Sequence, residues 1–159
     1  MEAHNSLNIV YNVYAKLLAT CLQLFLPHIV YKTQTSFIQK RCIFYNNFMF
    51  WDMIAIAQET KPDLTILLLD FEKAYDRVDC NFLYEVMGHL GLPSDYVKVV
   101  STLYNSTSSR VLVGGALGNT FPITRSVRQG CPLAPYLFLF VGDAFSASCI
   151  RTYYLLKGV

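Results

Sequence analysis

The chain has 159 residues, 53% of them hydrophobic, and its 13 Lys and Arg against 11 Asp and Glu give a formal net charge of +2. This length suffices for one domain with a core, and nothing in the sequence indicates two. The small net charge by itself decides little about nucleic-acid binding, because binding to a polyanion depends on local basic clusters and not on the total charge. The mean hydropathy of +0.33 is high for a free-standing soluble protein and indicates apolar surface meant for further chain or a partner.

The sequence carries no recognisable export or membrane signal. Residues 1–6 lack the basic start of a secretory signal. The apolar stretches at residues 11–25 and 135–150 contain polar residues and do not reach the roughly 18 uninterrupted apolar positions of a membrane span. The five cysteines form no C-x-x-C pair, which is typical of reduced thiols. We therefore expect an intracellular protein, nuclear or cytoplasmic, that is not secreted; a small membrane protein is the alternative.

Two helices are predicted first. Residues 7–25 and 43–60 both show apolar side chains at helical spacing, and the second run stops before Pro62. The apolar face of the first predicted helix comprises Leu7, Val10, Tyr11, Tyr14, Leu17, Leu18, Cys21, Leu22 and Phe25. The pattern of the second comprises Phe44, Phe48, Trp51, Ile54, Ala55 and Gln58.

A strand is predicted at residues 65–69. This run is short, continuously apolar and includes β-branched residues, which favours a central strand covered on both faces. Asp70 follows directly, so the strand would deliver one carboxylate to its end.

Local signals define the remaining elements. Residues 81–90 and 94–103 are predicted helices, with Gly91 as a C-cap between them, Ser94 as the N-cap of the second and Asp79 as a candidate cap of the first. Residues 109–113 and 120–124 alternate as the strands of a hairpin around a glycine-rich loop. The last helix is predicted from Leu133 to about Tyr154 and is entered through two prolines.

The first candidate site block is residues 64–76, which read Leu-Thr-Ile-Leu-Leu-Leu-Asp-Phe-Glu-Lys-Ala-Tyr-Asp. A strand terminus is a stiff place for a metal-binding carboxylate, and nucleotidyl transfer uses two divalent ions held by such groups. A strand that ends in Asp is a weak signal alone, because many α/β enzymes place acids there.

The second block is residues 128–138, Arg-Gln-Gly-Cys-Pro-Leu-Ala-Pro-Tyr-Leu-Phe. Gly130 allows the backbone to approach a ligand, Gln129 offers a donor and an acceptor, and Arg128 can pair with phosphate. The helix that follows presents free amides near its start. A proline-rich helix entry with capping polar groups is the structural alternative.

In this order, the two blocks strongly resemble the reverse transcriptases of non-LTR (LINE-type) retrotransposons. Residues 34–43 are also similar to a segment of the fingers that this family writes Gln-x-x-Phe-x-x-Gly-Arg-Ser. The chain departs from the family pattern at five positions: Lys40 and Ser126 replace glycine, Cys42 and Ala134 replace serine, and Tyr45 replaces aspartate. These departures raise a question of loop geometry, above all at Lys40.

The resemblance implies an α+β fold: a partial right-hand polymerase with helices packed on a small, mostly antiparallel sheet. The chain would be a single incomplete reverse transcriptase domain, with fingers at about 1–62 and a partial palm at about 63–159. Its family function would be RNA-directed DNA polymerisation by two-metal nucleotidyl transfer. The implied partners are an RNA template, a DNA primer, a dNTP and the missing palm and thumb segment, with no membrane.

The resemblance also assigns residues to roles. Asp70 would be the catalytic carboxylate and would bind Mg²⁺, and Tyr75 would lie under the incoming sugar; a core aromatic is the alternative for Tyr75. The nucleotide-binding set is Phe71, Tyr75, Arg128, Gln129 and Gly130, and the template or phosphate contacts are Lys40, Arg41 and Lys73.

The chain contains no Asp-Asp dipeptide and ends at Val159, before any Tyr/Phe-Ala-Asp-Asp box. We therefore expect it to be catalytically incomplete alone, because one carboxylate leaves a two-metal site short of ligands. The alternative is a non-catalytic remnant that binds nucleic acid or another protein.

Overall fold

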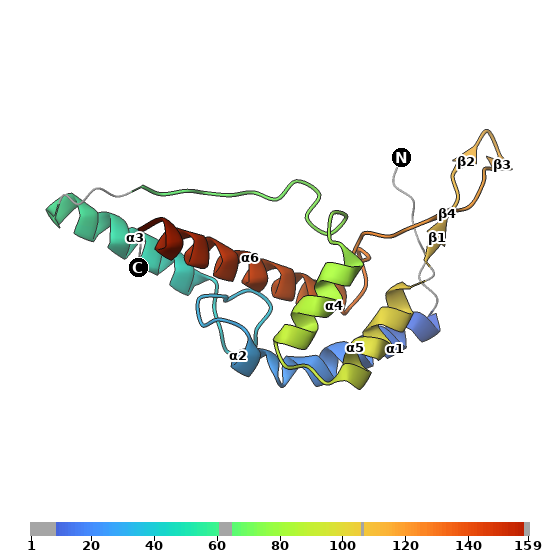
Figure 1. Cartoon of the computed structure of the whole chain (residues 1–159), viewed down its shortest axis with the longest axis horizontal. Helices are drawn as coiled ribbons and strands as arrows, with labels where there is room; N and C mark the ends of the chain where they lie inside the picture. Colours follow the sequence, from blue (N-terminus) through green and yellow to red (C-terminus); the bar gives the residue numbers. More distant parts are fainter. Residues whose placement is uncertain (1–8, 61–64, 106, 158–159) are drawn as a thin grey trace.

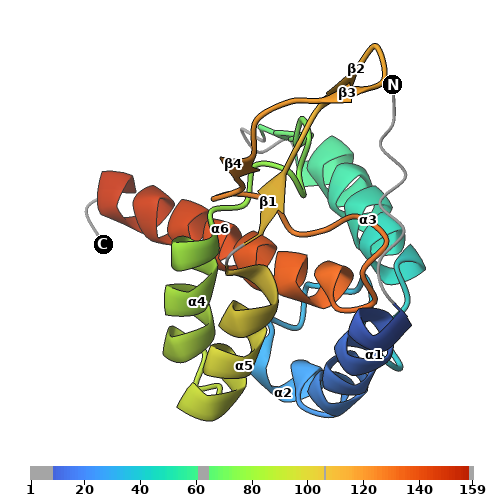
Figure 2. The same cartoon turned by 90° about the vertical axis from the view of Figure 1, so that its right-hand side faces the viewer.

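The computed structural model describes residues 9–60, 65–105 and 107–157, which form an elongated structure (Figures 1 and 2). Its elements are α1 (Ile9–Gln23), α2 (Leu26–Ile29), α3 (Phe44–Thr60), α4 (Cys80–His89), α5 (Ser94–Tyr104), β1 (Ser108–Ser109), β2 (Leu112–Val113), β3 (Ala116–Leu117), β4 (Phe121–Pro122) and α6 (Ala134–Lys157). The predicted α+β class is confirmed, and the ladders β1–β4 and β2–β3 are both antiparallel. In the described ranges, no helix is both long and apolar enough to cross a membrane.

The core forms around the first half of α6. This helix packs against α1 and α4, and α4 also packs against α5. Leu133, directly before α6, and Leu137 and Phe140 on it recur at helical spacing and are fully buried. They join a cluster that includes Leu83 and Met87 of α4. The segment that enters α6 is therefore held by the best-packed part of the molecule.

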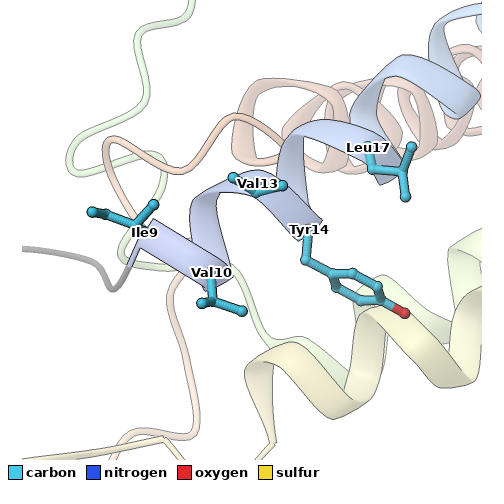
Figure 3. Close-up of a pocket in the computed structure, with 5 residues that line it drawn as sticks. All are labelled: Ile9, Val10, Val13, Tyr14 and Leu17. Carbon is cyan, nitrogen blue, oxygen red and sulfur yellow. The ribbon is translucent and has the colours of Figure 1, made fainter.

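Helix α1 confirms the first predicted helix, but the predicted face is buried only in part. The residues buried on it are Ala15, Leu18, Ala19 and Leu22, of which only the two leucines belong to the predicted face. The two alanines, which the prediction did not include, allow α1 to lie close to its neighbours. Val10, Tyr14 and Leu17 of the predicted face are exposed, and Leu7 lies outside the described residues. With Ile9 and Val13 they line a shallow apolar hollow on the outer side (Figure 3).

Helix α3 confirms the second predicted helix but contributes no buried residue. Phe48 and Trp51 are each 65% exposed, although the sequence pattern placed them on its apolar face. Within the described residues α3 packs on no other element, which accounts for their exposure. Both views show it apart from α4 and α5 (Figures 1 and 2).

The turn between α4 and α5 follows the local signals. Gly91 has φ +82°. The N–H of Leu92 donates to the carbonyl of Met87 at 3.1 Å, and the N–H of Gly91 donates to the carbonyl of Gly88 at 3.0 Å. These are the two bonds of a Schellman C-cap, which confirms the prediction for Gly91. The cap assigned to Ser94 is wrong: Pro93 is the N-cap and Ser94 is the first helical residue.

The predicted hairpin forms, but its loop is shorter than predicted, because Ala116 and Leu117 pair with Leu112 and Val113 as strand β3 before the predicted returning strand begins. Its tight turn is made by Gly114 and Gly115, whose φ values of 58° and 84° suit a type I′ turn. Between the two ladders, residues 110–111 face residues 118–120, so the returning strand carries a β-bulge. Figure 1 shows the hairpin projecting from the end of the molecule opposite α3.

Candidate functional site

The segment that leads to Asp70 is extended, but it is not a strand. No backbone hydrogen bond within the described residues involves residues 65–70, and each of these residues is exposed. Leu67 and Leu68 are 74% and 81% exposed. The prediction of a strand covered on both faces is therefore wrong, because a central strand needs neighbours on both sides and the described chain supplies none. Asp70 lies at the end of this segment with its carboxylate exposed.

The residues after Asp70 turn back onto α6. The ring of Phe71 lies edge-on to Phe145 at 5.4 Å and to Phe138 at 6.2 Å between ring centroids. The ring of Tyr75 stacks on Phe138 at 5.1 Å. One aromatic side chain of α6 thus holds both aromatic residues that the sequence assigned to nucleotide binding.

The backbone joins the two predicted blocks directly. The N–H of Val127 donates to the carbonyl of Tyr75 at 2.9 Å, and the N–H of Ser126 donates to the carbonyl of Val78 at 2.9 Å. The hydroxyl of Ser126 also donates to a carboxylate oxygen of Asp76, at 3.4 Å. Segments that are far apart in the sequence therefore form one unit, as their combination in a single site requires.

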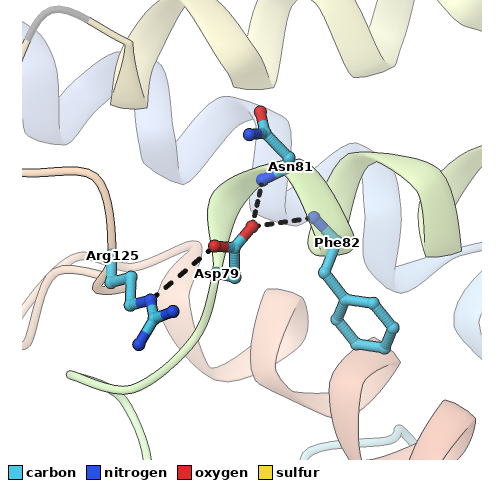
Figure 4. Close-up of polar contacts among 4 residues, drawn as sticks. All are labelled: Asp79, Asn81, Phe82 and Arg125. Carbon is cyan, nitrogen blue, oxygen red and sulfur yellow. Dashed lines mark hydrogen bonds and ion pairs between the residues drawn. The ribbon is translucent and has the colours of Figure 1, made fainter.

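Asp79 closes this junction on the side of α4 (Figure 4). Its Oδ1 accepts hydrogen bonds from the N–H groups of Asn81 at 3.0 Å and Phe82 at 3.1 Å, which confirms it as the helix cap. Its Oδ2 lies 3.7 Å from Nε of Arg125, and a β-bridge pairs the two residues. Both side chains are largely exposed, so the ion pair itself adds little stability.

The loop between Val127 and α6 exposes two of the predicted residues. Gln129 and Gly130 are exposed, and Gly130 has φ +80°, which favours glycine. Both lie shortly before α6. The predicted free amides at the start of this helix are not found, because the N–H of Ala134 donates to the carbonyl of Cys131 at 3.1 Å, that of Tyr136 donates to the carbonyl of Leu133 at 3.1 Å, and Pro135 has none. This loop is the part of the second block that can reach a ligand.

Arg128 is instead held from inside the protein. Its guanidinium carbon lies 4.9 Å from the centre of the Tyr11 ring, and its Nη2 donates to Oγ1 of Thr107 at 2.9 Å. Cys131 is buried beneath the same loop, with the hydroxyls of Tyr11 and Tyr104 each 3.6 Å from its sulfur. Tyr11, Thr107 and Tyr104 thus anchor the loop, and sequence reasoning gave them no such role.

This anchor changes the titration of its phenols. Burial raises the pKa of Tyr11 to about 12; hydrogen bonding to Cys131 adds to this shift and the positive charge of Arg128 opposes it. Burial also raises the pKa of Tyr104. Both phenols are therefore neutral at physiological pH, and the hydroxyl of Tyr104 donates to the sulfur of Cys131.

The loop of residues 31–41 carries the other predicted contacts. Arg41 donates to the carbonyls of Tyr31 at 2.6 Å, Gln34 at 2.7 Å, Pro27 at 2.9 Å and Val30 at 3.4 Å. Its guanidinium therefore organises this loop, in addition to any phosphate contact.

Two more features of this region bear on the site. The buried carboxylate of Asp143 accepts a hydrogen bond from the N–H of Tyr31 at 3.1 Å, which ties the loop to α6. Lys40 and Lys73 are exposed and have φ values of 64° and 50°. No contact within the described residues links either lysine to Gln129. The structure therefore does not bring these two predicted phosphate contacts together with the Gln129 loop.

The donor set does not make a complete metal site. In the part of the chain that the structure describes, no three His, Cys, Asp or Glu side chains lie close enough to hold a metal ion together. Asp70 supplies an exposed carboxylate, but two divalent ions need more ligands than this.

The geometry describes two sequence blocks joined near the start of α6, with an exposed acid in the first and an exposed Gln-Gly loop in the second. Comparisons with known proteins agree with this description. The family model for reverse transcriptase (RNA-dependent DNA polymerase) matches residues 4–156. The chain belongs to this family, whose members generally use a divalent metal ion.

Similar proteins come from mobile elements. The chain is 31% identical over 135 residues, 85% of its length, to the transposon TX1 uncharacterized 149 kDa protein of Xenopus laevis. It is 31% identical over 111 residues, 70% of its length, to the retrovirus-related Pol polyprotein from type-1 retrotransposable element R2 of Nasonia vitripennis. It covers 10% of the first protein and 11% of the second. The resemblance of the two blocks to a non-LTR retrotransposon reverse transcriptase is therefore confirmed.

Proposed function

We propose that these residues form the fingers, at about 1–62, and the first part of the palm, at about 63–159, of a retrotransposon reverse transcriptase. The observation that carries this proposal is the backbone junction between Tyr75 and Val127, because it unites the two blocks on which the family assignment depends. The proposed activity of the whole polymerase is RNA-directed DNA synthesis. Its partners would be an RNA template, a DNA primer and a dNTP.

The proposed roles follow the exposed groups. Gln129 and Gly130 face the nucleotide, since both are accessible next to the start of α6. Phe71 and Tyr75 form the wall behind it, because Phe138 fixes both rings. Arg128 acts by holding this loop as well as by its charge, since its guanidinium contacts Tyr11 and Thr107.

Asp70 is proposed as one ligand of Mg²⁺. A divalent ion of this kind would supply charge stabilisation for phosphoryl transfer. The described donors do not complete its coordination, so the remaining carboxylates would come from outside the residues that the structure describes. The 159-residue chain assayed alone is therefore proposed to be inactive.

Primer extension tests this inactivity. Purified chain would be incubated with an RNA template, a DNA primer, dNTPs and Mg²⁺, beside an Asp70→Asn variant. We expect no incorporation above the variant. Robust incorporation by the unmodified chain alone would overturn the proposal that it is incomplete.

Binding to a labelled RNA–DNA hybrid tests the polymerase origin independently of activity. We expect binding whose affinity falls steeply as salt rises. The double variant Lys40→Ala, Lys73→Ala should bind about tenfold more weakly. The matched control, Lys16→Ala with Lys32→Ala, removes two exposed charges outside the predicted contacts and should bind normally. Absence of binding even at low salt would contradict the proposal.

A non-catalytic remnant that binds protein is the second candidate. The exposure of Leu67 and Leu68 favours it, because an apolar segment this open in water is typical of a surface that another chain covers. Under this alternative, the chain would bind no RNA–DNA hybrid in the assay above.

A further inference from the structure

The hairpin of residues 107–125, called the arm below, stands out from the body of the protein (Figures 1 and 2). Each residue from 110 to 122 is exposed. In the described structure its strands pack only on each other and on no helix. The arm therefore contributes little to the core, and its exposed length is available for a partner.

The charge of this region has one sign. Residues 96–142 contain no Asp or Glu, and the charged side chains among them are Lys98, Arg110, Arg125 and Arg128. An acid-free segment with four basic residues attracts a polyanion and would gain nothing from a basic partner.

Two arginines of the arm contact a neighbour through Nε. Nε of Arg110 donates to Oγ1 of Thr120 at 2.6 Å, and Nε of Arg125 lies 3.7 Å from Oδ2 of Asp79 in a largely exposed ion pair. The terminal nitrogens of both side chains have no partner among the described residues. Both guanidinium groups can therefore offer their terminal nitrogens to phosphate oxygens, and the hydrogen bond to Thr120 also orients Arg110.

The arm also offers apolar groups between these charges. Leu112 faces Leu117 across the β2–β3 ladder, and these residues are 55% and 66% exposed. Proteins that lie in the minor groove of a double helix combine arginines with apolar side chains that contact sugars and base edges. The composition of the arm suits this surface better than a free single strand, which is bound mainly through stacking on aromatic residues.

The returning strand of the arm continues into the candidate site. Arg125 lies five positions after Thr120. At the rise of a β-strand this is a distance of about 16 Å, which corresponds to about five base-pair steps. Ser126 and Val127 then form the junction with Val78 and Tyr75. A double helix on the arm would thus have a fixed position relative to the Gln129 loop.

We propose that the arm lies along the groove of a nucleic-acid double helix, with Arg110 and Arg125 on phosphates and Leu112 and Leu117 against the groove floor. This inference rests on the proposed function and extends it, because it assigns the double-helical part of a template–primer to an element outside both sequence blocks.

The test measures binding of a labelled 20-base-pair RNA–DNA hybrid by fluorescence anisotropy at several salt concentrations. The variant Arg110→Ala, Arg125→Ala should bind at least tenfold more weakly, and the slope of log affinity against log salt should fall by about 2. The matched control, Lys16→Ala with Lys32→Ala, removes two exposed charges outside this basic segment and should leave the slope unchanged. Circular dichroism would verify that each variant is folded.

A second variant, Leu112→Thr with Leu117→Thr, keeps β-forming residues at the tip. It should weaken binding to the hybrid and leave binding to single-stranded RNA unchanged. Wild-type binding combined with an unchanged salt slope in the arginine variant would overturn the arm inference while the proposed function stands. Equal losses for hybrid and single strand would overturn the groove contact. Failure of the wild type to bind any nucleic acid would contradict both proposals.

Discussion

Lys40 and Ser126 both hold a positive backbone φ, 64° and 117°, in the two loops where the family resemblance places glycine. The chain therefore keeps the backbone path of a glycine while carrying side chains that disfavour it. The left-handed conformation costs a residue with a Cβ about 1 to 2 kcal/mol. Two departures from the family pattern therefore fall at strained positions, Ser126 at the junction of the two blocks and Lys40 in the loop of residues 31–41.

Replacing these residues with glycine should stabilise the protein. We expect Lys40→Gly to raise the free energy of unfolding by about 0.5 to 1 kcal/mol, because relief of strain exceeds the added chain entropy. Ser126→Gly should gain about 1 to 2 kcal/mol, because its φ lies further from the left-handed minimum. Urea unfolding followed by circular dichroism measures both. The matched control is Lys32→Gly, an exposed turn lysine without a positive φ, which should be destabilised.

Alanine substitutions at Arg41 and at its neighbour Lys40 should change the stability of the protein by different amounts. Arg41→Ala leaves four backbone carbonyls without their shared donor and should cost about 2 to 3 kcal/mol of unfolding free energy. Lys40→Ala should change stability by less than about 0.5 kcal/mol, because the side chain is exposed. Thermal unfolding of both variants checks the difference. Equal stability of the two would mean that the guanidinium does not organise the loop.

Local sequence signals predicted much of the fold. Asp79 and Gly91 cap their helix as expected, because capping depends on a few adjacent backbone groups. The Gly114-Gly115 turn followed from the need for positive φ at two successive positions. Each of these features is decided within a few residues, so each can be derived from the sequence without a partner segment.

The failures share a different cause. Whether residues 65–69 form a strand depends on neighbouring strands, and an apolar run does not say whether these exist. The buried face of α1 depends on how closely α6 approaches, which favoured Ala15 and Ala19 over larger residues. The contact of Tyr11 with Arg128 joins residues that are far apart in the sequence, so no local pattern could predict it. Within the site, the blocks were predictable and their anchors were not.

The raised pKa of Tyr11 predicts a loss of stability at high pH. Its pKa of about 12 in the folded state exceeds the ordinary tyrosine value of 10.0, so the unfolded chain loses this proton first. Stability from this group is therefore complete below about pH 10 and declines as pH rises toward 12. Tyr11→Phe should show a shallower decline between pH 9.5 and 11.5, measured by urea unfolding at each pH. An identical slope in the two proteins would contradict the raised pKa of Tyr11 and the burial that causes most of it.

The exposed leucines should drive self-association of the 159-residue chain. Leu67→Lys with Leu68→Lys places charges on an open, unpaired segment, and like charges there prevent edge-to-edge pairing. We expect a higher monomer fraction by size-exclusion chromatography with light scattering and an unchanged unfolding midpoint. Leu83→Lys is the contrasting control, because Leu83 is 1% exposed and the charge should unfold the protein. Unchanged association in the double variant would show that other surfaces cause it.

Phe138 should matter more than its partial burial suggests, because its ring contacts both Phe71 and Tyr75. Phe138→Ala should cost about 2 to 3 kcal/mol of unfolding free energy, from lost burial and two lost ring contacts. It should also speed hydrogen exchange at Asp76 and Arg77, whose N–H groups bond to the carbonyl of Lys73 at 2.9 and 3.1 Å.

Phe145→Ala is the matched control for this change, since Phe145 contacts Phe71 and is 41% exposed. It should cost about 1 kcal/mol and leave exchange at Asp76 and Arg77 nearly unchanged. Equal effects of the two variants on exchange would mean that the stack of Tyr75 on Phe138 does not order the turn. Faster exchange in Phe138→Ala alone would instead show that the contact with α6 keeps the turn of the first block rigid.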